Sequence, residues 1–314
     1  MKEEKNLQNI WVVSGIALLC CALWGSAFPC IKIGYKMFSI RSDSPGSQIL
    51  FAGYRFALAG VLTILFGSIL QKKILMPRRQ AVGKVFKISM LQTVLQYLFF
   101  YVGLAHTSGV KGAIIVGTNS LVAILIASLV FRQEKLTAPK LLGCLVGLAG
   151  VVTANLSGEG LSLDLTWNGE GFVFLSVISY ACSSVVMKRY SQEEDPVMLS
   201  GYQFLVGGVV MIVCGAAMGG RVRGFTVSST LMLLYLAFLS AVAYTLWGIL
   251  LKYNPVSRVA IYGFMNPVIG VLLSAILLGE GEQAFCVRNV AALFLVSAGI
   301  LIVNLWKGFS SDRG

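Results

Sequence analysis

Long runs without charge are the feature of this sequence that most constrains its fold. Between short charged segments the chain keeps to apolar residues for about 20 positions at a time, the length that a helix needs to cross a bilayer core of about 30 Å. Overall, 57% of the residues are hydrophobic and 12% are charged, whereas soluble proteins average about 45–50% and about 25%. The sequence therefore predicts an all-α membrane protein with ten transmembrane helices, near residues 11–35, 49–70, 86–105, 113–131, 140–156, 168–187, 197–218, 230–251, 259–278 and 289–306.

The Lys and Arg residues predict how these helices are oriented. With the N-terminus in the cytoplasm, 17 of the 25 fall in inner segments or at inner helix ends, seven fall outside, and Arg55 lies within a span. Cytoplasmic loops carry the excess of Lys and Arg in membrane proteins, so we expect both termini to be cytoplasmic. The seven outer residues are Lys32, Lys36, Arg41, Lys111, Arg221, Arg223 and Arg288.

This topology also explains the net charge of +12. A protein that binds nucleic acid gathers its basic residues into a patch or stripe on a soluble face, whereas here they stand in short clusters between apolar runs. The lipid bilayer is therefore the partner that the charge indicates, and no nucleic acid is expected. The sequence leaves the oligomeric state open.

Four short motifs recur in the same order in the two halves of the chain. Each half would be one five-helix repeat. Because five is odd, the second repeat enters the membrane from the opposite side, and a pseudo-two-fold axis in the membrane plane relates the two. We expect a first repeat over residues 1–156, an outside linker over 157–167 and a second repeat over 168–314. The pairs are "WGSAFPCIK" (24–32) with "YACSSVVMK" (180–188), "GYRF" (53–56) with "GYQF" (201–204), "HTSGVKGAIIVGTNS" (106–120) with "YNPVSRVAIYGFMNP" (253–267), and "AGVVTAN" (149–155) with "AGILIVN" (298–304).

Some of these motifs resemble those of a known family. "LWGSAFPCIK" in the first helix, "YRF" in the second and "NPVIGVLLSAILLGE" at 266–280 are similar to the motifs of the EamA-type carriers of the drug/metabolite transporter superfamily, and the resemblance covers essentially the whole chain. It implies an integral ten-helix carrier, often an exporter of amino acids or related small metabolites. Ser120 departs from the pattern, because the second copy has Pro267 there. We therefore expect the helix of residues 113–131 to bend differently from that of 259–278.

The repeat itself indicates a function. Inverted repeats place a substrate site near the membrane midplane and allow two mirror-related gating states, which alternating access needs. We expect a transporter that exports small metabolites such as amino acids, in the inner membrane of a bacterial cell; a channel or a multidrug exporter is the alternative. A membrane-embedded enzyme is disfavoured, because all four aspartates and the single histidine lie in loops, tails or helix ends. No catalytic residue, metal site or cofactor is indicated.

Polar and aromatic residues near the midplane are the candidates for substrate contact. Tyrosine and tryptophan offer flat apolar walls with polar tips, and asparagine offers both donors and acceptors. Such side chains also tie one membrane helix to another, and for each residue taken alone this structural role is as well supported as ligand contact. The predicted substrate-binding set is Trp24, Arg55, Tyr97, Asn119, Tyr180, Tyr244, Trp247 and Asn266.

Arg55 has two interpretations. It lies about six residues into its span, so its long side chain can snorkel to the outer headgroups. Alternatively, it faces an outer vestibule and attracts an anionic group such as a substrate carboxylate. Its counterpart in the second repeat, Gln203, is neutral, so this attraction would act on one side only.

Overall fold

Helices make up the regular structure of the chain. The computed structural model describes residues 6–41, 43–104, 106–107, 109–155, 166–278 and 287–305, and no strand lies among them. Within these residues, helix occupies all ten ranges expected from the sequence. The expected linker at 157–167 falls outside the described residues up to position 165.

Among the described residues, the first half of the chain contains ten helical elements, several of which follow one another without a break. They are α2 (Ile10–Met37), α3 (Pro45–Leu70), η1 (Arg79–Ala81), α4 (Val82–Ile88), η2 (Ser89–Leu95), α5 (Gln96–Leu104), α6 (Gly109–Gly117), α7 (Asn119–Leu125), η3 (Ile126–Val130) and α8 (Ala138–Asn155). The second half contains η4 (Trp167–Gly171), α9 (Phe172–Tyr190), α10 (Pro196–Ala217), α11 (Val227–Tyr253), α12 (Val256–Ala260), η5 (Ile261–Phe264), α13 (Met265–Leu278) and α15 (Val287–Leu305).

Several helical segments are long and apolar enough to cross a bilayer. Among the described residues six meet this condition by length and composition, and three shorter apolar helices accompany them. The chain is therefore an integral membrane protein. The six are Ile10–Met37, Pro45–Leu70, Arg79–Leu104, Trp167–Tyr190, Pro196–Ala217 and Val227–Tyr253; the shorter three are Asn119–Val130, Ala138–Thr153 and Val290–Leu305.

Two of the segments are interrupted near corresponding points. In the first half, Thr118 separates α6 from α7, and the segment ends in η3, a π-helical turn. In the second half, the 3₁₀ turn η5 separates α12 from α13. Both segments are therefore broken, and the turns at the two breaks differ in kind. The expected difference in how the two helices bend stays a prediction. The hydroxyl of Ser120 donates to the carbonyl of Ala260 at 2.6 Å, which joins the two interruptions.

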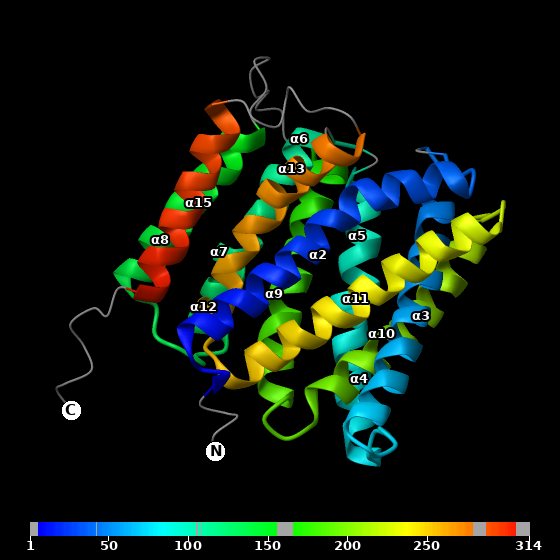
Figure 1. Ribbon diagram of the computed structural model, residues 1–314, viewed down its shortest axis with the longest axis horizontal. Helices are drawn as coiled ribbons and strands as arrows, with labels where there is room; N and C mark the ends of the chain where they lie inside the picture. The colour runs from blue at the N-terminus through cyan, green and yellow to red at the C-terminus, as the bar shows by residue number, and fades with distance from the viewer. Residues whose placement is uncertain are drawn as a thin grey trace.

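The main helix contacts join the two halves of the sequence. α3 packs against α10, α8 against α15, α2 against α11 and α13, and α9 against α5 and α7. Figure 1 shows α8 and α15 side by side at one edge of the bundle, and α3 with α10 and α11 at the other. Each buried apolar cluster among the described residues accordingly takes side chains from both halves.

Glycines allow the close approach of α3 and α10. A Cβ atom added to Gly60 would lie 2.5 Å from the backbone nitrogen of Leu205, and one added to Gly208 would overlap the backbone nitrogen of Ala57. Small residues let helix backbones approach closely in a membrane, where packing is the main attraction between helices. These glycines thus let the backbones of α3 and α10 cross closely, a few residues beyond the two copies of the tetrapeptide.

One end of the bundle carries many of the basic residues. Figure 1 shows that α2 begins and α15 ends at this end, which we call the basic end. Lys84 pairs there with Glu193 at 2.6 Å and with Glu194 at 2.9 Å, and Lys73 lies 3.8 Å from Asp195. These contacts bring the start of the Arg79–Leu104 segment beside the connection that follows α9.

Candidate functional site

Four of the predicted residues form one aromatic contact in the core. Trp24 of α2 packs edge-on against Tyr244 and Trp247 of α11, with ring centroids 5.0 and 4.9 Å apart. The hydroxyl of Tyr97, on α5, lies 3.1 Å from that of Tyr244. The structure therefore brings together side chains from both halves of the chain, as the repeat predicts for a central site.

Two phenylalanines that the sequence analysis did not select extend this contact. The rings of Phe56 and Phe204 are stacked 5.2 Å apart with planes 4° from parallel. Phe56 lies 4.7 Å from Tyr97, and Phe204 lies 4.9 Å from Tyr244, measured between ring centroids. The signal that could have found them is the recurrence itself, because each is the last residue of "GYRF" or "GYQF". We call Trp24, Phe56, Tyr97, Phe204, Tyr244 and Trp247 the aromatic cluster.

The remaining predicted tyrosine and the two asparagines differ in their placement. Tyr180, on α9, packs against the buried group that includes Phe56, Phe204 and Tyr244. Asn119 begins α7 and Asn266 lies in the first turn of α13. Among the described residues, no ring contact or hydrogen bond joins either asparagine to the aromatic cluster. The structure thus places Tyr180 with the cluster and shows no direct bond between the asparagines and the cluster among the described residues.

Several buried polar atoms near the interrupted helices and the cluster have no partner among the described residues. A buried polar group usually forms a hydrogen bond, and each exception needs an explanation. One explanation is that these atoms bind a polar guest. They include Nε1 of Trp24, Oε1 of Gln92 and Gln96, and Oδ1 of Asn119 and Asn266.

Arg55 is buried between α3 and α11. Only 4% of the residue is exposed, and its Nε donates to Oγ of Ser240 at 2.9 Å and to the carbonyl of Leu236 at 3.3 Å. The side chain therefore does not run along the protein surface to the headgroups, and the snorkelling interpretation is wrong for this structure. Because Ser240 lies four residues before Tyr244, the guanidinium is held about one helical turn from the aromatic cluster.

The counterpart of Arg55 is bound in a matching way. Gln203 is fully buried, and its Oε1 accepts a hydrogen bond from the hydroxyl of Thr93 at 2.7 Å. Thr93 precedes Tyr97 by four residues, as Ser240 precedes Tyr244. Arg55 and Gln203 are thus each hydrogen-bonded to a hydroxyl group that lies one helical turn before a tyrosine of the aromatic cluster.

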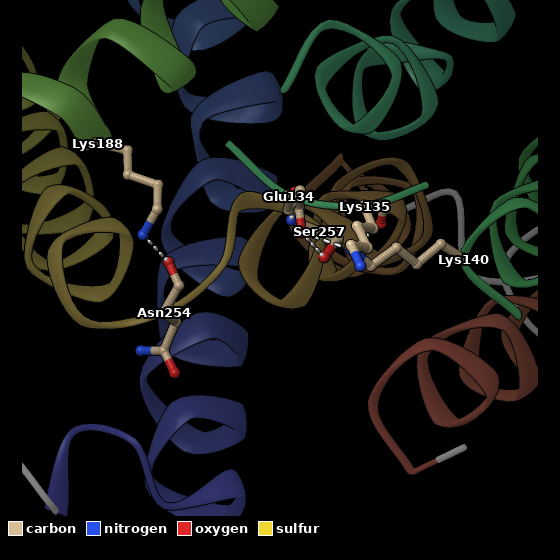
Figure 2. Close-up of polar contacts among 6 residues, drawn as sticks. All are labelled: Glu134, Lys135, Lys140, Lys188, Asn254 and Ser257. Atoms are coloured by element: carbon tan, nitrogen blue, oxygen red, sulfur yellow. Dashed lines mark hydrogen bonds and ion pairs between the residues drawn. The ribbon is translucent and has the colours of Figure 1, made fainter. Parts of the chain in front are cut away.

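Polar contacts that the sequence analysis did not select hold the basic end together. Figure 2 shows the carboxylate of Glu134 between Ser257 and Lys140: it accepts from the backbone N–H of Ser257 at 2.9 Å and from Nζ of Lys140 at 2.7 Å. Nζ of Lys188 donates to the carbonyls of Asn254 and Leu251 at 2.6 and 3.1 Å. These contacts therefore hold the connection after η3 to the start of α12, and the end of α9 to the end of α11.

A second carboxylate is bound at the start of the η4–α9 segment. Glu170 accepts from the hydroxyl of Thr107 at 2.6 Å and from both the N–H and the hydroxyl of Thr166 at 2.8 Å, and Lys111 pairs with it at 3.3 Å. Within the described part of the chain, no group of three or more His, Cys, Asp or Glu residues is placed to hold a metal ion.

Comparison with known proteins gives a consistent result. The model of the EamA-like transporter family matches residues 11–156 and 167–305. The uncharacterized inner membrane transporter YedA of Escherichia coli K12 is 28% identical over 288 residues, which cover 91% of this chain and 88% of that one. A probable amino-acid metabolite efflux pump of Salmonella typhimurium is 25% identical over 300 residues, covering 91% and 93%. One solved crystal structure matches with a TM-score of 0.79 at 17% identity, over 96% of this chain and 99% of that chain; this likeness shows the fold alone.

Proposed function

The chain belongs to the EamA-like transporter family, and on that premise we propose that it exports small metabolites, amino acids among them, by alternating access. It is a membrane transporter and not an enzyme. The observation that carries the proposal is the aromatic cluster, which takes its side chains from both halves of the chain. A site shared by two halves opens to one side or the other when the halves rock about it.

The proposal requires ten spans in two inverted five-helix repeats, residues 1–156 and 168–314, joined by an outside linker. The helix contacts support this arrangement, because the most extensive contacts between helices correspond to one another when the two halves are exchanged. The α3–α10 and α8–α15 contacts each map onto themselves, the α2–α11 contact maps onto α5–α9, and the α2–α13 contact maps onto α7–α9.

Single residues follow the same exchange. The stacked pair Phe56–Phe204 and the hydroxyl pair Tyr97–Tyr244 join equivalent positions, as two residues near a pseudo-two-fold axis must. The bond between Arg55 and Ser240 has its counterpart in the bond between Gln203 and Thr93. These contacts support an axis that passes close to the aromatic cluster.

The lining of the site supports a small guest that is partly apolar. Tyr97, Tyr244, Trp24 and Trp247 offer flat walls, and Tyr180 closes a further side. Aromatic rings contribute large apolar contact areas, while their hydroxyl and indole groups still offer hydrogen bonds. Asn119 and Asn266 would supply amide groups from the two interrupted segments. The Salmonella relative, described as an amino-acid metabolite efflux pump, supports amino acids as the class to test first.

For the membrane and the orientation, the proposal is a bacterial inner membrane with both termini in the cytoplasm. The Escherichia coli relative is described as an inner membrane transporter. The basic end, where α2 begins and α15 ends, would then be the cytoplasmic end, in line with the excess of Lys and Arg in cytoplasmic loops.

Proteoliposomes test the proposed function. We expect vesicles preloaded with an amino-acid mixture to release one or more components only when they contain the protein, with an efflux that saturates as the internal concentration rises. A channel would instead give single-channel currents in a planar bilayer and a flux that does not saturate. A multidrug exporter would release cationic dyes and leave the amino acids inside. Either of these last two results would overturn the proposal.

A further inference from the structure

We propose that Arg55 is an anion anchor beside the aromatic cluster and that the transported metabolite is an organic monocarboxylate with an apolar body. This inference rests on the proposed function, and it names the class of substrate that the same site would hold. The carboxylate would bind the two terminal nitrogens of the guanidinium, and the apolar body would lie against the rings of the cluster.

The charge of Arg55 is buried without a counter-ion among the described residues. Its Nε is bound to Ser240 and Leu236, but no hydrogen bond or ion pair joins its terminal nitrogens to the part of the chain that the structure describes. A guanidinium has five N–H donors, and a buried charge is costly unless it is paired. The terminal nitrogens therefore remain available for an anion that the chain itself does not provide.

The way in which Arg55 is held suits a carboxylate. Ser240 and Leu236 both accept hydrogen bonds from Nε of Arg55. These bonds fix the plane of the guanidinium and leave its terminal nitrogens without a partner among the described residues. Two parallel N–H groups of an arginine match the two oxygens of a carboxylate, and such bidentate pairs are stronger and more specific than neutral hydrogen bonds. Ser240 is accordingly a positioning residue for this anchor.

The location of the anchor determines the rest of the ligand. The guanidinium carbon of Arg55 lies 5.1 Å from the ring centroid of Phe56, a member of the aromatic cluster. Ser240 lies one turn from Tyr244 on α11. A molecule with its carboxylate at Arg55 would therefore place its side chain against these rings, so an apolar or aromatic side chain fits and a charged side chain does not.

The anchor is present in one half only. At the equivalent position, Gln203 is neutral and fully buried, with its Oε1 bound to Thr93. The site thus offers one cation, which neutralises one carboxylate and would leave the second charge of a dicarboxylate unpaired. The ligand would also bind in a single orientation, with its carboxylate toward α3.

Matched acid and amide probes test the inference. Purified protein would be titrated with phenylalanine, leucine, threonine and 3-phenylpropionate, and with the amide of each, while the fluorescence of the tryptophans is followed. We expect at least one acid to bind about ten- to a hundredfold more tightly than its amide, as a charge-assisted contact worth about 1.5–3 kcal/mol would give. Amides that bind the native protein as tightly as their acids would overturn the inference.

Variants assign the preference to Arg55. In Arg55→Gln the acid should bind no better than its amide, while Arg55→Lys should keep part of the preference, because it keeps the charge but loses the bidentate geometry. Ser240→Ala should weaken binding of the acid and leave binding of the amide unchanged, and Ser240→Thr should restore the affinity for the acid. The control Lys87→Gln removes an exposed charge on α4 and should change neither the affinity for the acid nor that for the amide. An acid preference that survives Arg55→Gln would contradict the proposal.

Two further outcomes separate this inference from competing accounts. If chloride alone stabilises the native protein but not Arg55→Gln, and displaces every acid, the anchor holds an inorganic anion and the monocarboxylate assignment falls. If proteoliposomes show saturable amino-acid efflux with equal rates for native protein and Arg55→Gln, the proposed function stands and this inference fails. If no acid or amide binds and no saturable efflux occurs, both fail.

Discussion

Asn119 and Asn266 each bury an amide oxygen that has no partner among the described residues. Removing such an atom takes away no hydrogen bond that the described residues make, so Asn266→Ala should leave abundance and thermal stability near native. If the amide contacts substrate, the half-saturation concentration should rise about fivefold, which corresponds to about 1 kcal/mol. Efflux from proteoliposomes at a series of internal concentrations measures this change.

Asn304 supplies the matched control for this prediction. Its Oδ1 is likewise buried without a partner among the described residues, but it lies on α15, which packs against α8. Asn304→Ala should leave the half-saturation concentration unchanged. A loss of stability in Asn266→Ala with unaltered affinity would instead assign that residue a purely structural role.

At the scale of residues, the sequence could predict which aromatic side chains meet because the repeat pairs them. Tyr97 and Tyr244 occupy equivalent positions, and the structure joins their hydroxyls at 3.1 Å. Phe56 and Phe204 were not predicted, because phenylalanine lacks the polar tip that marks the other candidates, although the recurring tetrapeptide pairs these two residues as well. The burial of Arg55 depends on Ser240, which is 185 residues away in the chain, and no local pattern encodes that contact.

At the scale of elements, the crossing of α3 and α10 is the contact most sensitive to size. Gly208→Ala would set a Cβ against the backbone nitrogen of Ala57, where a side-chain rearrangement cannot relieve the overlap. Overpacking of this kind costs about 1–3 kcal/mol. Thermal unfolding in detergent should show a lower midpoint than that of Gly15→Ala, whose added Cβ has no atom within 4 Å. Equal midpoints for the two variants would show that the helices do not meet as closely as described.

The basic end gives a second prediction at this scale. Lys188→Met removes the charged donor that binds the carbonyls of Leu251 and Asn254 at the end of α11. Because hydrogen bonds to charged groups contribute about 1.5–3 kcal/mol each in favourable cases, the variant should unfold at a lower temperature than native protein. Lys87→Met, which alters an exposed side chain, is the control and should unfold as the native protein does. A Lys188→Met midpoint equal to that of the control would contradict the role assigned to this contact.

The approximate positions of the helices can be predicted from the uncharged runs in the sequence. Their exact ends and the irregular turns within them cannot. All ten expected ranges contain helix in the described residues, but the segment predicted at 86–105 begins at Arg79. Lys84 lies inside that helix because Glu193 and Glu194 pair with it, and a rule that ends a span at a charge cannot anticipate this. The π-helical turns η2 and η3 also leave no periodicity signal in an apolar run.

At the scale of the whole molecule, the orientation in the membrane can be tested with single cysteines on a cysteine-free background. Ile74, in the connection at the basic end, is 82% exposed, and Arg223 lies exposed in the connection before α11. A membrane-impermeant thiol reagent added outside intact cells should label Arg223→Cys and spare Ile74→Cys, because the basic end is proposed to be cytoplasmic. The reverse labelling would overturn the orientation and leave the fold intact.

The measurement that tests the central claim most directly is counterflow in proteoliposomes. Vesicles preloaded with an excess of the panel acid that binds most tightly would be diluted into a trace of the same acid in labelled form. A carrier that alternates about the aromatic cluster should accumulate the label transiently above its equilibrium level. Each outward cycle with unlabelled acid exposes the site to the labelled acid outside, and the excess of unlabelled acid inside then competes with the label for the return. The overshoot should be strongly reduced in Tyr244→Ala, which removes the ring that joins Trp24, Tyr97 and Phe204. Label that rises to equilibrium without an overshoot, at a rate proportional to its concentration, would contradict alternating access.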